Sequence, residues 1–133
     1  MSFEAGQELA AQEYQVTRAD LIRYAGASLD FNPIHWSDRV ATSVGLPGVI
    51  AHGMYTLALA SRAVVEWAGD VETIVEFGGR FTKPVEVPDD DTGTTVRVAG
   101  KVADVADGLA RIDITVTCRG AKVLGMTKAL VRC

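Results

Sequence analysis

A carboxylate and an imidazole lie five positions apart in a segment that cannot continue a helix. Residues 30–35 read Asp-Phe-Asn-Pro-Ile-His, and Pro33 fixes its own φ at about −65° while keeping Asn32 out of the helical conformation. We therefore expect the chain to reverse here and to aim Asp30 and His35 at one point. General acid–base catalysis requires such a pair, and imidazole titrates near neutral pH.

The same residues also suit an ordinary turn. Asp commonly opens turns and Asn-Pro is a turn signal, so His35 alone fits an exposed polar position equally well. Two observations favour chemistry: catalytic groups concentrate in loops, and a second histidine, His52, precedes Gly53 at the start of a long predicted helix.

Composition narrows the class of protein. The chain has 133 residues, which predicts one domain over residues 1–133, and a net charge of −4. Its 13 Lys and Arg residues are scattered, which argues against a nucleic-acid partner because phosphate binding needs a basic face. The chain contains no long apolar run and begins with a mildly acidic segment. We therefore expect no membrane span and no signal peptide, and a cytoplasmic location.

The two cysteines predict neither a metal site nor a nucleophile. Cys118 and Cys133 form no C-x-x-C pair and have no zinc-site spacing. Cys118 is far in sequence from both histidines, the bases that could deprotonate its thiol. Both are expected to be free thiols.

Hydrophobic spacing predicts helices in the first half of the chain and strands in the second. A capping-box-like start at Thr17 begins a helix that ends near Gly26, and Ser37 caps a short second helix. Strands alternate with turn signals at residues 107–108 and 119–120. The long helix is expected over residues 52–67, and the strands over residues 13–16, 71–85 with a bend at 78–79, 94–105, 109–118 and 123–131.

These elements predict an α+β fold in which an antiparallel sheet wraps one long helix. The inner face of that helix carries small residues at positions 58, 60, 61 and 63, which let a sheet approach closely. Small residues are also good helix formers, so this feature alone does not decide the packing. The layered architectures open to one domain favour the wrapped helix.

Residues 24–36 and 51–54, which read YAGASLDFNPIHW and AHGM, resemble the hydratase motif of the MaoC-like (R)-specific enoyl thioester hydratase and dehydratase family. The resemblance covers essentially the whole chain and is closest to the HadB-type (3R)-hydroxyacyl-ACP dehydratase subunit of actinobacteria. One position departs from the motif, because the family usually has glycine where this chain has Leu29. Glycine would permit a left-handed backbone there.

The resemblance implies a hot-dog fold and the reversible conversion of trans-2-enoyl thioesters into (3R)-hydroxyacyl thioesters, without a cofactor or metal. Asp30 and His35 are the implied catalytic pair, and the Gly53 backbone N–H is the implied oxyanion donor. In the dehydration direction we expect His35 to take the α-proton and Asp30 to help the hydroxyl leave as water, with the roles reversed for hydration.

The resemblance also implies supporting residues. Asn32 should hold the reactive loop and Ser61 should hydrogen-bond the catalytic carboxylate, although a pure turn role and a pure packing role suit them as well. His52 is expected to cap the helix or order the loop, outside the catalytic set. Candidate contacts to the phosphates of coenzyme A or an acyl carrier protein are Arg39, Arg62, Arg80 and Lys83.

Three rival interpretations remain open. Asp30, His35 and His52 together match a two-histidine, one-carboxylate metal set. The chain also fits a non-catalytic partner subunit of a heterodimeric dehydratase, or a hot-dog acyl thioesterase. A homodimer, or a heterodimer with a related hot-dog subunit, is expected because a long edge strand gains from being covered.

Overall fold

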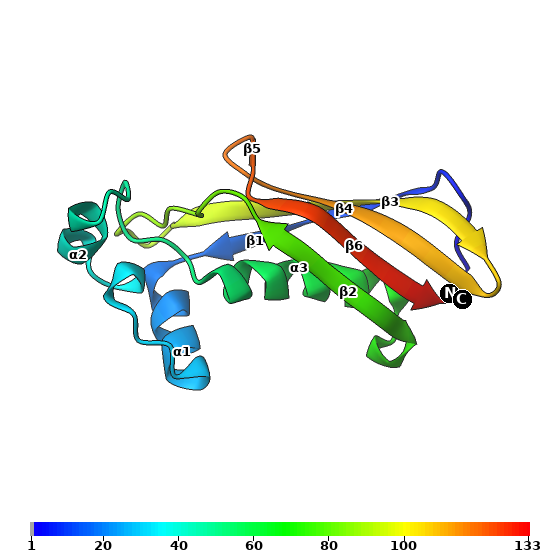
Figure 1. Ribbon diagram of the computed structural model, residues 1–133, viewed down its shortest axis with the longest axis horizontal. Coiled ribbons are helices and arrows are strands. Elements are labelled where there is room, and N and C mark those ends of the chain that lie inside the picture. The colour runs from blue at the N-terminus through cyan, green and yellow to red at the C-terminus, as the bar shows by residue number, and fades with distance from the viewer. Residues whose placement is uncertain (1) are drawn as a thin grey trace.

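The computed structural model describes residues 2–133, in which a long helix, α3 (Gly53–Ala68), lies along a curved antiparallel sheet (Figure 1). The strand order is β1-β3-β4-β6-β2, with a short strand, β5, paired to β4. This arrangement is the predicted α+β hot-dog fold. The strands are β1 (Glu8–Val16), β2 (Ile74–Phe81), β3 (Thr94–Ala106), β4 (Leu109–Cys118), β5 (Ala121–Lys122) and β6 (Leu124–Arg132).

The helices that precede α3 in the chain gather beside its N-terminal end (Figure 1). They are α1 (Arg18–Ser28), the 3₁₀ helix η1 (Pro33–His35) and α2 (Asp38–Ser43). The predicted capping box at Thr17 and the predicted cap at Ser37 both form. These helices therefore place the loop between α1 and α2 near the start of α3.

The strand prediction was wrong at the ends of one segment. Residues 71–73 form a 3₁₀ helix, η2 (Val71–Thr73), because the Asp70 side chain accepts a hydrogen bond from the Glu72 N–H. The segment after Phe81 leaves the sheet, since the Thr82 N–H bonds the Val123 carbonyl and Pro84 has no N–H to donate. Only residues 74–81 of the predicted 71–85 stretch are strand.

Smaller differences concern element ends. The first helix continues past Gly26 to Ser28, and β1 begins at Glu8, five residues earlier than predicted. The two-residue strand β5 was not predicted, because a segment that short has no recognisable period. Cys118 and Cys133 are free thiols, as predicted.

The core lies between α3 and the inner face of the sheet. Ala60 and Ala63 of α3 are fully buried, as are Val98 of β3 and Ile112 of β4. Of the small residues predicted on this face, Ala60 and Ala63 are buried and let the helix approach the sheet closely, whereas Ser61 is partly buried and Ala58 is exposed, so the prediction was wrong for Ala58. At the far end of α3 the Trp67 indole N–H donates to the Ala10 carbonyl of β1 over 2.7 Å.

In the part of the chain that is described, no helix combines the length and apolarity needed to cross a membrane.

We predict that Gly100→Ala destabilises the fold by about 1–3 kcal/mol, because overpacking a core forces its neighbours to move. An added Cβ would lie 2.6 Å from two ring carbons of Trp67, which is itself buried. Gly26→Ala is the matched control, since its Cβ would meet nothing within 4 Å on helix α1. It should stabilise by about 0.5–1 kcal/mol. Urea unfolding measures both, and equal effects of the two substitutions would contradict the packing described here.

Candidate active site

The loop that carries Asp30 begins with an unusual helix cap. Leu29 closes α1 in the left-handed conformation, with φ 65° and ψ 19°, and its N–H donates to the Ala25 carbonyl over 2.8 Å. A side chain in this conformation costs about 1–2 kcal/mol. The turn before Asp30 therefore forms without the glycine that the family usually has, and the Leu29 side chain is 75% exposed.

Short hydrogen bonds within the loop hold it in place. The Asp30 Oδ1 accepts from the Asn32 N–H over 3.2 Å, and the Asn32 Oδ1 accepts from the Ile34 N–H over 3.3 Å. Pro33 opens the 3₁₀ helix that ends at His35. The predicted reversal thus occurs, and Asn32 serves it as a turn residue.

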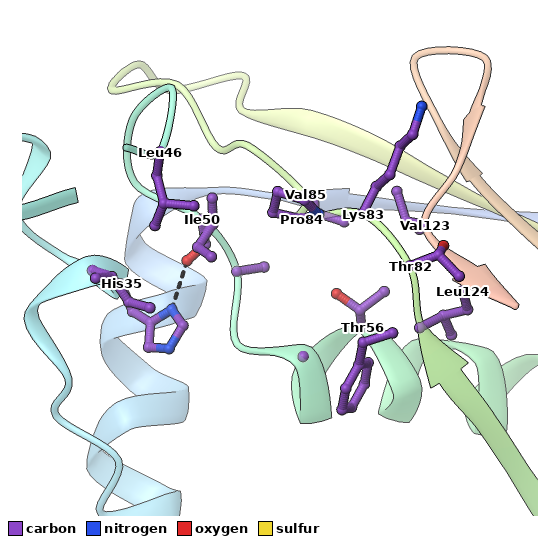
Figure 2. A pocket seen from close by; sticks show the side chains of 14 residues that line it. His35, Leu46, Ile50, Thr56, Thr82, Lys83, Pro84, Val85, Val123 and Leu124 are labelled. Atoms are coloured by element: carbon purple, nitrogen blue, oxygen red, sulfur yellow. Dashed lines mark hydrogen bonds between the residues drawn. The ribbon is translucent and has the colours of Figure 1, made fainter. Parts of the chain in front are cut away.

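The side chains of Asp30 and His35 face each other at a distance too long for a hydrogen bond. The His35 Nε2 lies 4.0 Å from the Asp30 Oδ2, and the two side chains are 9% and 51% exposed, respectively. The His35 Nδ1 lies 2.7 Å from the Ile50 carbonyl oxygen (Figure 2). A carbonyl only accepts, so Nδ1 carries the hydrogen and the Nε2 of the neutral ring keeps its lone pair. The free basic nitrogen of His35 is therefore the one nearer Asp30.

His52 packs against this pair. It is 2% exposed, and its ring stacks on His35 with centroids 3.8 Å apart and planes inclined by 21°. Its Nε2 lies 3.1 Å from the Asp30 carbonyl oxygen. Burial lowers the pKa of His52 and nearby His35 lowers it further, while the hydrogen bond to the Asp30 carbonyl opposes the shift.

The metal interpretation of these three residues meets a geometric difficulty. Ligand atoms of Asp30, His35 and His52 lie within 4.8 Å of one another. A histidine binds a metal through a lone pair in the plane of its ring. Because the two rings are stacked and nearly parallel, their lone pairs do not converge on one point. The stacking favours an acid–base site over a metal site.

Gly53 is the first residue of α3, where backbone N–H groups lack partners within the helix and the helix dipole attracts negative charge. His52, the N-cap residue, makes no side-chain cap hydrogen bond. A Cβ at position 53 would lie 3.1–3.2 Å from three ring carbons of Phe81. The Phe81 ring thus occupies the space that a Cβ would need, and glycine lets this ring pack against the first turn of the helix.

A largely apolar cavity of about 420 Å³ adjoins these groups. His35 and Gly53 both line it, between the segment that precedes α3 and the segment that follows β2 (Figure 2). The side chain of Lys83 extends away from His35 and Thr56 at its edge (Figure 2). The apolar lining comes mainly from Ile34, Leu46, Ile50, Phe81, Val85 and Val123.

An ion pair that the sequence analysis did not identify ties the site to the scaffold. Arg18 donates to the Val87 carbonyl over 2.6 Å and to the Asp38 carboxylate over 2.9 and 3.1 Å. The Asp38 Oδ1 also accepts from the Val49 N–H over 2.9 Å. The Val49 N–H and then Arg18 hold the pKa of Asp38 below its usual value. Asp38 thereby fixes the residue next to Ile50, whose carbonyl orients His35.

The structure does not place all of the supporting residues implied by the resemblance at the site. Within residues 2–133 the Ser61 hydroxyl donates to the Ala58 carbonyl over 2.8 Å, and the predicted hydrogen bond from Ser61 to Asp30 is not formed. The helix offers that hydroxyl an acceptor one turn earlier, which is common for serine. All four proposed carrier contacts are exposed. Lys83 also lines the cavity, and the guanidinium carbon of Arg62 lies 5.0 Å from the Tyr14 ring centroid.

Comparison with known families decides the assignment. The model of the MaoC like domain matches residues 2–119. The chain belongs to the MaoC-like dehydratase family. A solved structure described as a MaoC-like dehydratase is 32% identical, with a TM-score of 0.94 over 98% of this chain and 40% of the other. The R-hydratase PhaJ1 from Pseudomonas aeruginosa is 27% identical, with a TM-score of 0.81 over 98% of this chain and 82% of the other.

Curated relatives of this MaoC-like chain are longer proteins. The 3-hydroxyacyl-thioester dehydratase X of Mycobacterium tuberculosis is 39% identical over 56% of this chain and 25% of its own length. The fatty acid synthase beta subunit pkiC of Emericella nidulans is 44% identical over 47% of this chain and 3% of its own length. The matched part of the chain thus spans a quarter or less of either relative.

We predict that Asp38→Asn lowers the free energy of unfolding by about 1 kcal/mol at pH 7, a discounted value because the carboxylate is half exposed. The folded-state pKa of Asp38 is depressed, so its contribution is present above the unfolded pKa of about 3.9 and fades as pH falls toward the folded value. The loss should therefore shrink in urea unfolding at pH 3. Asp89→Asn, on an exposed turn, is the charge-matched control. The same loss in both variants at pH 7 would refute the anchoring role.

Proposed function

We propose that this MaoC-like domain catalyses the reversible addition of water to trans-2-enoyl thioesters to give (3R)-hydroxyacyl thioesters. The observation that carries the proposal is the placement of the His35 Nε2 4.0 Å from the Asp30 Oδ2, with His35 and Gly53 lining one apolar cavity. Acid, base and oxyanion donor are the three groups that the reaction needs.

In the proposed dehydration, the two side chains act at adjacent carbons of the substrate, C2 and C3. The His35 Nε2 takes a proton from C2 while protonated Asp30 gives its proton to the hydroxyl on C3, which leaves as water. The electrons of the broken C2–H bond form the new double bond. In hydration, the Asp30 carboxylate takes a proton from water while the water oxygen bonds to C3, and the electrons of the C2–C3 double bond take up a proton at C2 from protonated His35.

The start of α3 has the electrostatics that this step requires. Removal of the C2 proton places negative charge on the thioester oxygen, and the Gly53 N–H at the positive end of the helix is the proposed donor. One preorganised donor of this kind contributes about 3 kcal/mol to the barrier in well-studied enzymes. The position of Gly53 on the cavity wall is consistent with that role.

The substrate carrier and the assembly are also proposals. The apolar cavity suits the acyl chain, and Lys83 at its edge suits a phosphate of coenzyme A or of a carrier-bound phosphopantetheine. Strand β2 is an outer strand of the sheet and exposes Val75 and Phe81. A second copy or a related hot-dog subunit would cover this edge. Membership of the HadB-type group follows as a proposal from the sequence resemblance.

The test follows the enoyl thioester absorbance when the protein is mixed with crotonyl-CoA, with free thiol measured in parallel. We expect hydration without thiol release, and a loss in kcat/KM of at least about 100-fold in Asp30→Asn and in His35→Asn, the magnitude usual for an acid or base. Asp89→Asn, which changes the same charge on an exposed turn outside the cavity lining, should keep full activity.

Three outcomes would contradict the proposal. Release of thiol would identify a thioesterase. Full activity in Asp30→Asn or His35→Asn would remove the proposed pair. Absence of turnover with both the CoA substrate and the corresponding acyl carrier protein substrate would favour a non-catalytic partner subunit.

A further inference from the structure

We infer that His52 is the positioning residue of this site, a neutral imidazole that holds the Asp30 backbone through its Nε2–H and supports the His35 ring through its face. The inference rests on the proposed function and assigns no proton transfer to His52. Within the described structure, His52 contacts both members of the proposed catalytic pair and precedes the proposed oxyanion donor directly in the chain.

The hydrogen bond to Asp30 determines which nitrogen of His52 carries the hydrogen. The Nε2 lies 3.1 Å from the Asp30 carbonyl oxygen, which can only accept. In the neutral ring the other nitrogen, Nδ1, then bears a lone pair. This Nδ1 is buried and has no hydrogen-bond partner among residues 2–133. Protonation would place a second N–H where nothing accepts it, a costly arrangement in a buried site.

The groups that surround His52 leave its pKa lowered on balance, because burial and His35 lower it while Asp30 opposes the shift. Asp30 and His35 face it from the loop, and Tyr24 of α1 meets it edge-on with centroids 4.7 Å apart. Tyr55 of α3 packs against Tyr24, with ring centroids 5.2 Å apart. Burial is the largest cause of the lowered pKa of His52. The ring is thus fixed between α1, the loop and the start of α3.

A neutral ring in this place serves the proposed chemistry. His35 becomes positively charged each time it takes a proton, and a charged ring stacked 3.8 Å away would oppose that step by like-charge repulsion. Uncharged His52 supports the His35 ring without this penalty. The Ile50 carbonyl restrains His35 at one nitrogen and His52 restrains it at one face.

His52 is therefore expected to affect turnover more than substrate affinity. It is buried and absent from the lining of the cavity that His35 and Gly53 share. Its substitution should leave the binding surface intact while it loosens the catalytic pair. Misplacement of catalytic groups by about 1 Å can lower rates by about 100-fold.

Two variants separate the two contacts of His52. His52→Phe keeps a flat ring against His35 and removes the donor to Asp30, whereas His52→Gln keeps an amide N–H and removes the ring. In each we expect kcat for crotonyl-CoA hydration to fall on the order of 10- to 100-fold, with KM changed by less than about threefold. Urea unfolding of each variant checks that it is folded under the assay conditions.

The decisive kinetic test is the double variant Asp30→Asn/His52→Phe. Because His52 acts through the pair, removal of Asp30 should abolish its effect, and the double variant should match Asp30→Asn within about threefold. Losses that multiply would overturn the inference. Unchanged kcat in folded His52→Phe and His52→Gln would also overturn it.

An NMR measurement on the unaltered protein tests the inference without any assay of activity. Long-range ¹H–¹⁵N spectra should show His52 as the neutral Nε2–H tautomer, with a titration midpoint below the usual value of about 6.5. An Nδ1–H tautomer, or a midpoint at or above that value, would overturn the inference. A protein without hydratase activity that still shows this tautomer would refute the proposed function and not the placement of His52.

Discussion

The hydrogen bond from the His35 Nδ1 to the Ile50 carbonyl is the contact on which the proposed site depends. It fixes the tautomer and so leaves the Nε2 as the free base near Asp30. A carbonyl can do this only if its own segment is rigid. The Ile50 N–H bonds the Ile34 carbonyl over 3.2 Å, and the Ala51 N–H bonds the Val85 carbonyl over 2.8 Å. The segment before α3 is thus tied to the reactive loop on one side and to the chain after β2 on the other.

The rest of the fold holds these two segments at the end of one helix. Buried alanines let α3 pack closely on the sheet, which fixes the position of its first turn. The ion pair of Arg18 and Asp38 joins α1, α2 and the Val49 backbone. Loop, helix end and cavity wall therefore meet at one place although they come from separate parts of the chain. Catalysis by positioned groups requires this kind of rigid support.

The sequence predicted those features that depend on local spacing. The period of the apolar residues predicted all three α-helices and most strands, and Pro33 predicted the reversal that brings Asp30 toward His35. Contacts between distant residues were not predictable in this way. The Arg18–Asp38 pair spans twenty positions, and the partner of the Ser61 hydroxyl depends on a competition between the helix and the loop. The family's glycine at position 29 would permit a left-handed backbone, as noted from the sequence, but propensity could not show that Leu29 adopts this conformation, because a side chain opposes it.

Isotope labelling with H₂¹⁸O and a crotonyl thioester shows which carbon the water attacks. We predict one ¹⁸O in the C3 hydroxyl of an intact (3R)-hydroxybutyryl thioester, with no label in the carbonyl. Mass spectrometry of the product, with chiral analysis at C3, measures both the position and the configuration. Label in a free carboxylate, or an (S) product, would contradict the account.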